Sequence, residues 1–533
     1  MVADMTALVV GAGPTGLLLG SELRRRGVNC RIIDAHPTSL PWDRATVVHP
    51  RSLELFESLG IAAPLLAAGV KQRVARLYSA GSILGEIDLA DCGSRYGFNI
   101  GLSEEVTESI LTEYLHRQGG EIMRSCRLID LQQQEDGVLV TIERSGAREQ
   151  LSAQWVVGCD GNRSTVRTLG GIELSGHDII KPWAVFDATL LGWPESYEAN
   201  YCYLDELPVI LTALPKQRWR VYLRPSAPDS DLVTDALSTL GRYLPKVSFD
   251  DIANPTRFHC HTKVAERFRS GRILLAGDAA HVCSPAQGHG MNSGLQDAFN
   301  LAWKLALVCQ GHCTPALLDS YEAERRPVAE MITASGDAVE LAQTMTDPAE
   351  RHARDETLRA LFADPTARHH EVMAEAELDV DYGASAIVMG DRHEALAPGQ
   401  RVPDTVGVHR GDGEACLLHE LANHAGHTAL LIGGLAADSE ALARLAEAIR
   451  ARSHAPLIDA VVVLTARSDG QSPHTRLAIA AAEQLGVGEI TLLVVRPDGY
   501  VGLRTDRDHT EALSAYLALL GVPPGSMTPC APD

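Results

Sequence analysis

Three glycines near the start of the chain constrain its fold more than any other feature. Gly11, Gly13 and Gly16 lie between an apolar segment, residues 7–10, and a helical pattern over residues 17–26. In a strand–turn–helix unit, this GxGxxG spacing lets backbone NH groups and the helix N-terminus approach a pyrophosphate without obstruction by a Cβ atom. The sequence therefore predicts a Rossmann-like α/β domain that binds a dinucleotide; the alternative is a glycine turn without a ligand.

An acidic residue follows at the end of the next apolar segment. Asp34 comes directly after residues 30–33, whose composition is typical of a buried strand. A carboxylate at this place can accept hydrogen bonds from the ribose hydroxyls of adenosine. We therefore expect Asp34 to contact an adenosine whose ribose carries no 2′-phosphate.

A second glycine-bearing turn contains Asp160 and Gly161, followed by Arg163 and Arg167. It comes after residues 154–158, which form a short apolar strand pattern. The turn could serve the nucleotide site, but an acidic turn that only caps the following helix is an equally good interpretation.

The longest motif spans residues 271–306. A buried strand pattern ends at Gly277 and Asp278, and a glycine-rich loop then opens a new helix near Asn292. Such a loop lets the backbone approach a planar ring closely. The helix N-terminus, around Gly290 and Met291, can stabilise negative charge on a reduced flavin.

Strand and helix patterns divide the chain into four segments. Broken strands with aromatic residues follow the second turn, residues 333–373 are helical in pattern, and strands at 429–432, 460–464 and 490–495 alternate with alanine-rich helices. The predicted class is α/β, or α+β overall. We expect the Rossmann-like domain at residues 1–175, an inserted antiparallel substrate-binding sheet at 176–265 that could include residues near 70–100, the completion of the first domain with a helical segment at 266–395, and a second α/β domain at 396–533.

Composition excludes several functional classes. The chain has 69 acidic and 47 basic residues, a net charge of −22, which disfavours binding to nucleic acid or to anionic lipid. No apolar run approaches the ~20 residues that cross a bilayer, so we expect a cytoplasmic protein with a small-molecule partner. The 11 cysteines include no CxxC pair, and we expect reduced thiols.

With these three motifs in this order, the chain resembles the single-component class A flavoprotein aromatic hydroxylases, the group of para-hydroxybenzoate hydroxylase and phenol hydroxylase. The resemblance covers roughly residues 1–340. Further on, residues 398–404 (PGQRVPD) and 496–504 (RPDGYVGLR) resemble the thioredoxin-like C-terminal domain of that family. The absence of CxxC argues against dithiol redox chemistry in this domain.

The resemblance implies an enzyme that binds FAD, consumes NADH or NADPH, and reacts with O2. A flavin hydroperoxide would then hydroxylate a phenolic or polycyclic aromatic substrate. Glu104 stands where many relatives have a glutamine that touches the flavin ribityl chain. The residues expected at the cofactor are Gly11, Ala12, Gly13, Pro14, Thr15, Gly16, Asp34, Ala35, Arg44, Glu104, Leu128, Asp160, Gly161, Gly277, Asp278, Pro285, Gly288, Gly290, Met291 and Asn292.

Other outcomes are compatible with the same motifs. The flavin oxygen chemistry could instead give epoxidation or Baeyer–Villiger insertion, because one fold can host several reactions. The chain could also be a flavin-containing binding protein without turnover, or a flavin dehydrogenase or reductase without oxygen insertion. A homodimer formed through the C-terminal domain is a further alternative.

The substrate side has four candidate residues. Pro285 would border the reactive edge of the flavin, as the resemblance implies. His49 could lie in the pocket or be a structural histidine, and Arg220 could pair with a substrate carboxylate or face solvent. Tyr222 could line a pocket, although aromatic residues in sheets more often belong to the core.

No metal site is expected. His259 and His261 flank Cys260, but adjacent residues on a strand point to opposite faces and no further ligands follow nearby. His281, inside the third motif, is expected to hold the strand-to-helix turn.

Overall fold

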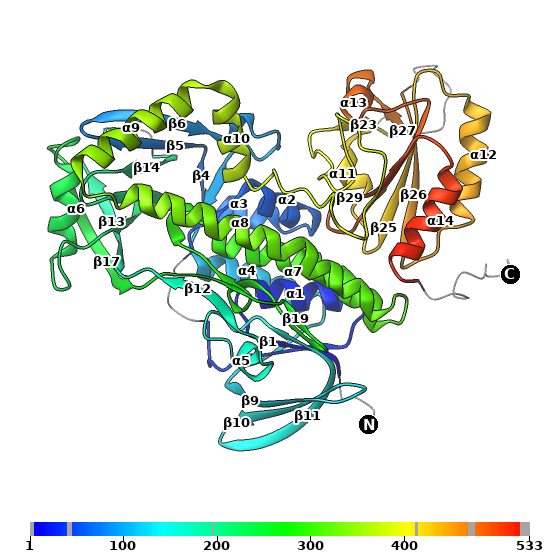
Figure 1. Cartoon of the computed structure of the whole chain (residues 1–533), viewed down its shortest axis with the longest axis horizontal. Coiled ribbons are helices and arrows are strands. Elements are labelled where there is room, and N and C mark those ends of the chain that lie inside the picture. Colours follow the sequence, from blue (N-terminus) through cyan, green and yellow to red (C-terminus); the bar gives the residue numbers. More distant parts are fainter. Residues whose placement is uncertain (1–4, 40–44, 195–196, 411–413, 467–474, 523–533) are drawn as a thin grey trace.

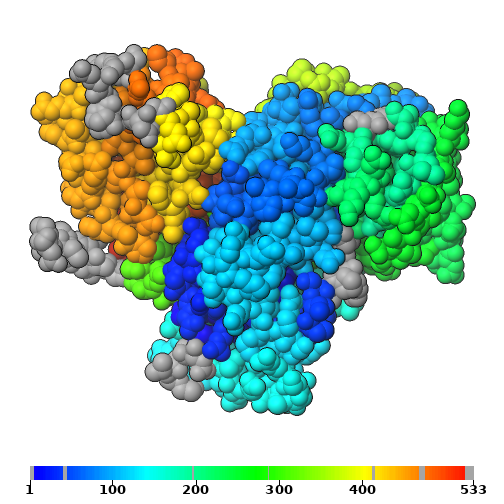
Figure 2. All heavy atoms as spheres, turned by 180° about the vertical axis from the view of Figure 1, so that it is seen from behind, coloured from blue at the N-terminus to red at the C-terminus, as the bar shows by residue number. Residues whose placement is uncertain are grey.

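The computed structural model describes residues 5–39, 45–194, 197–410, 414–466 and 475–522. A central α/β unit lies between an antiparallel sheet and a C-terminal mixed sheet (Figure 1). Two long helices, α7 (His289–Cys309) and α8 (Asp319–Gln343), run across the middle of the molecule. Seen from behind, the yellow-to-orange C-terminal part and the green sheet lie on opposite sides of the blue N-terminal part (Figure 2).

The central sheet is built around β1 (Met5–Val10), which pairs in parallel with β2 (Cys30–Ile33) and β11 (Ala147–Gly158). β11 pairs in parallel with β20 (Ile273–Leu275). Carboxyl ends of parallel strands meet at one edge of a sheet. All three glycine motifs and Asp34 therefore lie along the same edge. The remaining strands are β8 (Ile122–Met123), β9 (Cys126–Gln133), β10 (Val138–Arg144) and β19 (Arg269–Ser270).

Helices cover this sheet and bury its apolar strands. α1 (Pro14–Arg25) packs against α7 and against α4 (Glu104–Arg117). Leu17, Leu115 and Leu301 belong to the resulting core and are fully buried. Smaller elements of this unit are α2 (Pro50–Ser58), α3 (Ala62–Ala68), α5 (Thr165–Leu169), the sheet β3 (Val47–Val48), β7 (Asn99–Gly101) and β4 (Val70–Gln72), and the sheet β12 (Leu174–Asp178), β18 (His261–Ala265) and β21 (His281–Val282).

The second sheet has seven strands and one apolar face. β14 (Ala199–Tyr203) pairs in parallel with β5 (Val74–Ser79), so the sheet includes a segment that precedes it in the chain. α6 (Leu232–Leu240) packs on its apolar face. The other strands are β6 (Ser82–Asp88), β13 (Trp183–Leu191), β15 (Val209–Leu214), β16 (Arg218–Leu223) and β17 (Ser248–Phe258).

The helical pattern of residues 333–373 is three helices rather than one. After α8, a new helix α9 (Pro348–Ala363) begins where the Asp347 carboxylate accepts hydrogen bonds from two backbone NH groups. Asp364 caps α10 (Pro365–Glu375) in the same way. An Asp-Pro pair ends one helix and starts the next, because proline at the first helical position needs no hydrogen-bond partner.

The C-terminal sheet has eight strands. β25 (His427–Gly433) is fully buried and pairs in parallel with β26 (Ile458–Thr465) and antiparallel with β28 (Ile490–Val495). Trp303 and Leu307 of α7 share a hydrophobic cluster with these strands, so the C-terminal core is continuous with that of the central unit. The remaining elements are β22 (Met389–Gly390), β23 (Gly407–His409), β24 (Ala415–Leu417), α11 (Leu418–Leu421), α12 (Ser439–Arg450), β27 (Thr475–Leu477), α13 (Ile479–Gln484), β29 (Val501–Thr505) and α14 (His509–Leu519).

Among the described residues, no helix is both long enough and apolar enough to span a membrane.

Candidate active site

The first glycine turn is shaped for a close backbone approach. Gly11 has φ +106°, and a Cβ there would lie 2.2 Å from the carbonyl oxygen of Cys159. A Cβ on Gly16 would lie 2.0 Å from the carbonyl oxygen of Gly11. α1 begins just after Gly13 without a side-chain cap, so its first NH groups keep their capacity to donate. This arrangement fits a pyrophosphate of FAD at the helix N-terminus.

Asp34 ends β2 beside this turn. Its two carboxylate oxygens accept hydrogen bonds from the backbone NH groups of Ala12 and His36, each at 2.7 Å. Arg124 lies 3.8 Å away. Each carboxylate oxygen has a second lone pair, so the half-buried side chain can still accept a ribose hydroxyl. Leu128 packs its side chain in the core of the sheet, so only its backbone is available to a cofactor.

Two glutamates lie in the first two turns of α4. Glu104 accepts a hydrogen bond from the Ala45 backbone NH at 3.1 Å. Glu108, one turn later, lies 3.9 Å from the position of a Cβ on Gly13. Burial and then the charge of Glu104 raise the pKa of Glu108 to about 7. We did not identify Glu108 from the sequence, although its i,i+4 spacing from Glu104 was the available signal. Arg44 lies outside the described residues.

The Asp160-Gly161 turn does cap a helix. The Asp160 carboxylate accepts hydrogen bonds from the Thr165 and Val166 backbone NH groups at 2.7 and 3.1 Å. Arg167 donates to the carbonyl oxygens of Asn162, at 2.7 Å, and of Ala279, at 3.0 Å. The turn is therefore tied to the segment that follows Gly277, and the two motifs form one structural unit.

Asp297 of α7 holds the Gly277 turn. It is fully buried and accepts hydrogen bonds from the Gly277 backbone NH at 3.0 Å and from Arg325 at 2.7 Å. His281 lies 2.7 Å from the same carboxylate. This contact confirms the structural role expected for His281. Asp278 itself is exposed at the edge of the sheet.

The loop before α7 is fastened to the segment around His49. Gly288 has φ +74° and precedes α7, which begins without a side-chain cap. The Asn292 side-chain amide donates to the carbonyl oxygens of Val47 and Gly288, both at 2.9 Å, and its oxygen accepts from the His49 backbone NH at 3.0 Å. These contacts fix the N-terminus of α7 against residues 47–49.

His49 is fully buried beside this loop. Its Nδ1 lies 3.1 Å from the side-chain oxygen of Asn99. Its Nε2 has no hydrogen-bond partner among the described residues and lies 3.4 Å from the position of a Cβ on Gly288. Since an amide oxygen can only accept, Nδ1 donates to Asn99, and in the neutral imidazole Nε2 then presents a lone pair.

The antiparallel sheet places its tyrosines on two faces. Tyr201 and Tyr203 belong to its hydrophobic core. Tyr222 lies on the other face, with its hydroxyl 3.3 Å from Oγ1 of Thr46. Arg220 does not face solvent: it is 1% exposed and donates to Asp187 through Nε at 2.8 Å and Nη2 at 2.9 Å. Asp187 therefore already neutralises its charge.

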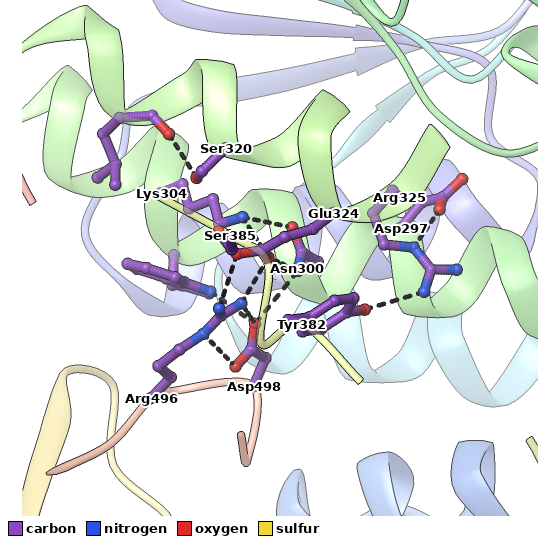
Figure 3. Close-up of polar contacts among 12 residues, drawn as sticks. Asp297, Asn300, Lys304, Ser320, Glu324, Arg325, Tyr382, Ser385, Arg496 and Asp498 are labelled. Atoms are coloured by element: carbon purple, nitrogen blue, oxygen red, sulfur yellow. Dashed lines mark hydrogen bonds and ion pairs between the residues drawn. The ribbon is translucent and has the colours of Figure 1, made fainter. Parts of the chain in front are cut away.

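A buried ionic network joins α7 and α8 to the C-terminal domain (Figure 3). Glu324 of α8 accepts two hydrogen bonds from Arg496, both at 2.8 Å, and one from Lys304 of α7 at 2.7 Å. Burial opposes the charge of Glu324, but Arg496 and Lys304 outweigh it and lower its pKa. The Asp498 side chain accepts from Trp303 at 3.1 Å. None of these contacts was predicted from the sequence.

Two groups of histidines could be considered as metal ligands. His261 of the His259–His261 segment pairs with Asp178 at 2.7 Å. Among the described residues, His49, His289 and Glu377 have ligand atoms within 4.8 Å of one another. The two imidazole rings stack with an interplanar angle of 23°, so their in-plane lone pairs run side by side rather than toward one point.

Comparison with known proteins identifies a flavin-binding family. A family model described as FAD binding domain matches residues 4–335. 6-Methylpretetramide 4-monooxygenase of Streptomyces rimosus is 32% identical over 99% of this chain and 95% of its own. Pentachlorophenol 4-monooxygenase of Sphingobium chlorophenolicum is 34% identical over 62% of this chain and 63% of its own.

Solved structures agree with this assignment. Anhydrotetracycline hydroxylase from Streptomyces rimosus has a TM-score of 0.78 and 29% identity, with 98% of this chain and 99% of that chain covered. A ternary complex of aklavinone-11 hydroxylase with FAD and aklavinone has a TM-score of 0.77 and 28% identity, with 98% of this chain and 99% of that chain covered. The resemblance drawn from the glycine motifs is thus confirmed. The chain belongs to the class A family of FAD-dependent aromatic hydroxylases, and it is a flavin-dependent aromatic monooxygenase.

Proposed function

We propose that this monooxygenase hydroxylates a multi-ring aromatic compound, with NADH or NADPH as the reductant. The proposal rests on the share of this chain that each relative matches. The relatives named for pretetramide and aklavinone match 99% and 98% of the chain. The enzyme named for pentachlorophenol, a single-ring phenol, matches 62%.

The edge of the central sheet is the proposed FAD site. The NH groups at the start of α1 would bind the pyrophosphate, Asp34 the ribose, and the loop from Pro285 to Asn292 the flavin ring. When bound, FAD supplies the reaction with the nicotinamide and with O2. The protein supplies the rest: it holds the ring in place, excludes water and orients the substrate. Residues proposed to contact FAD besides Asp34 are Gly11, Ala12, Gly13, Pro14, Thr15, Gly16, Ala35, Glu104, Leu128, Asp160, Gly161, Gly277, Asp278, Pro285, Gly288, Gly290, Met291 and Asn292.

The substrate would lie between the flavin loop and the face of the antiparallel sheet that carries Tyr222. The contact between Tyr222 and Thr46 supports this placement, because Thr46 lies three residues before His49. Arg220 would act as a positioning residue: its pair with Asp187 joins β13 and β16 on this same face.

His49 is the proposed base for a substrate hydroxyl, because its buried Nε2 presents a lone pair beside the flavin loop. Replacement by glutamine, H49Q, keeps a polar side chain at this position but removes the base. We expect kcat to fall by about 10²- to 10⁴-fold, as for loss of a general base, with FAD still bound. An H49Q enzyme with unchanged kcat and an unchanged pH–rate profile would exclude this role.

The decisive experiment is aerobic oxidation of NADH and NADPH by the FAD-loaded protein, with and without phenols and multi-ring aromatics. Products are read by mass spectrometry and their structures by NMR. We expect stimulated oxidation coupled to a gain of ~16 mass units, one oxygen atom, with multi-ring compounds. Preference for single-ring phenols would contradict the proposed substrate class, and a ring-expanded product would indicate oxygen insertion instead of hydroxylation.

We also propose that residues 396–533 form a thioredoxin-like domain. The strand order β26-β25-β28-β29 supports this, with β25 and β26 parallel and β28 and β29 antiparallel to their neighbours. α12 and α14 pack against these strands. Because the sequence has no CxxC pair, the domain would have a structural rather than a redox role.

A further inference from the structure

The first residue of α7 belongs to a buried pair that the proposed function leaves without a role. His289 and Glu377 are 7% and 4% exposed, and Nδ1 of His289 lies 2.8 Å from Oε1 of Glu377. The Gln296 side-chain amide donates to the other carboxylate oxygen at 2.6 Å. The pair is therefore enclosed, and both carboxylate oxygens are hydrogen-bonded.

The left-handed backbone at Glu377 ends helix α10. Its φ is +57°, and the backbone NH groups of Glu377 and Leu378 donate to the carbonyl oxygens of Ala374 and Met373 at 3.1 and 3.0 Å. This is the hydrogen-bond pattern of a Schellman helix end, and it fixes where the Glu377 side chain meets α7. A buried ion pair is itself weak support for stability, because desolvation offsets the Coulomb attraction. Stability alone therefore does not account for the buried pair.

The surroundings decide which partner carries the proton. Burial lowers the pKa of His289, but the hydrogen bond to Glu377 and its charge outweigh burial, and the pKa is raised. Glu375 and Asp379 act in the same direction. The other group that faces the ring is His49, stacked at 4.9 Å between ring centroids. His289 is therefore the positive end of the pair, and it lies at the start of α7.

We propose that the His289–Glu377 pair, whose positive end lies on the first residue of α7, raises the reduction potential of the bound FAD. The inference rests on the proposed placement of the flavin ring at the N-terminus of α7. Reduced flavin carries more negative charge than oxidised flavin. An imidazolium at this helix start adds to the positive end of the helix dipole and favours the reduced form.

The test is an anaerobic potentiometric titration of bound FAD in the wild type and in H289Q, over a range of pH. Glutamine keeps a hydrogen-bonding side chain but carries no charge. We expect a lower midpoint potential in H289Q, where each tenfold loss of preference for reduced flavin is about 30 mV for a two-electron couple. The difference between the midpoint potentials of wild type and H289Q should narrow as the pH rises, because His289 of the wild type then loses its proton. H261Q, which removes the imidazole paired with Asp178 at 2.7 Å, is the matched control and should leave the potential unchanged.

A second variant tests the pair as a unit. E377Q removes the carboxylate that keeps His289 protonated. The midpoint potential of FAD bound to E377Q should therefore fall like that of FAD bound to H289Q. The double variant H289Q/E377Q should show no further fall in this potential. E377Q also keeps the proposal testable if H289Q loses FAD. Equal potentials in wild type and H289Q, or a fall that does not change with pH, would overturn the proposal. Failure of the proposed function is distinguished by the product assay, which does not depend on the potential.

Discussion

At the scale of single residues, the site depends on positions that accept only one kind of side chain. Gly11 is the clearest, because both its φ of +106° and the nearby Cys159 carbonyl exclude a Cβ. Glu108 is the opposite case: a carboxyl group placed where the folded protein disfavours its charge. The two residues lead to different experiments.

Replacement of Gly11 by alanine should abolish FAD binding. The new Cβ would lie 2.2 Å from the Cys159 carbonyl oxygen, so the turn must move away from the helix N-terminus. The ratio of flavin to protein absorbance measures this loss. Gly60 is a matched control: its φ is +69°, but a Cβ there meets nothing within 4 Å. G60A should cost about 1–2 kcal/mol of stability and retain FAD; a flavin-replete G11A would refute the steric argument.

Glu108 should make the flavin-free protein less stable as the pH rises. Its pKa is 4.5 in an ordinary setting and about 7 here, so between these values the folded state binds more protons than the unfolded state. The free energy of unfolding therefore falls across that window. E108Q should be more stable than wild type by about 1–2 kcal/mol at pH 8, after allowance for partial exposure, and equal to it near pH 4. Denaturant titrations measure both.

The exposed neighbour Glu105 provides the control for this experiment. E105Q lies on the same helix and removes the same charge from its surface. It should leave the pH dependence of unfolding unchanged. If the free energies of unfolding of E108Q and of wild type changed with pH in parallel, Glu108 would be ionised in the folded protein.

At the scale of elements, α7 connects several parts of the candidate site. Asn292 in its first turn holds the preceding loop, Asp297 holds the Gly277 turn, and Lys304 reaches the network of Arg496 and Glu324 (Figure 3). The side chains of this network are fully buried. Such a network tolerates the loss of one partner poorly, because the remaining charge stays out of water.

Replacement of Arg496 by methionine should destabilise the protein by about 3–5 kcal/mol, because Glu324 keeps only one of its two cationic partners. The midpoint of chemical unfolding measures the change. R507M is the control: Arg507 is paired with Asp391 at 3.4 Å, and the side chains are 77% and 70% exposed. Its removal should change stability by no more than about 1 kcal/mol. Equal midpoints for R496M and R507M would argue against a stabilising network.

At the scale of the whole molecule, the central unit and the C-terminal domain share a core. Trp303 and Leu317, which precede the boundary near residue 395, cluster with Leu431 and Leu503 beyond it. Arg51 of α2 also donates to the Asp498 carbonyl oxygen at 2.7 Å. The two parts are therefore joined by apolar packing and by buried polar contacts.

Removal of residues 396–533 should prevent stable folding of the remainder. The truncated chain would expose the apolar side of α7 and leave Lys304 and Glu324 without Arg496. We expect aggregation and loss of FAD, measured by size-exclusion chromatography and flavin absorbance. A monomeric, flavin-bound fragment with an unchanged thermal midpoint would show that the C-terminal domain is dispensable.

The local parts of this protein could be predicted from sequence alone. A strand that ends in Gly-x-Gly-x-x-Gly and a helix that starts there are encoded within a few residues, and the structure has both at β1 and α1. The element boundaries were less accurate: α7 begins at His289, three residues before the expected start near Asn292, because the glycine-rich loop is itself the first turn of the helix.

Only the tertiary structure decided which distant side chains meet. His289 and Glu377 are 88 residues apart, and Arg496 and Glu324 are 172 apart. The sequence separation of two such residues does not predict their contact. The contact depends on how sheets and helices pack, and not on the period of a helix or a strand. The sequence by itself thus determined the FAD-binding motifs and the reaction class. The packing of α7 against both flanking units decided the burial, the charges and the partners of the site.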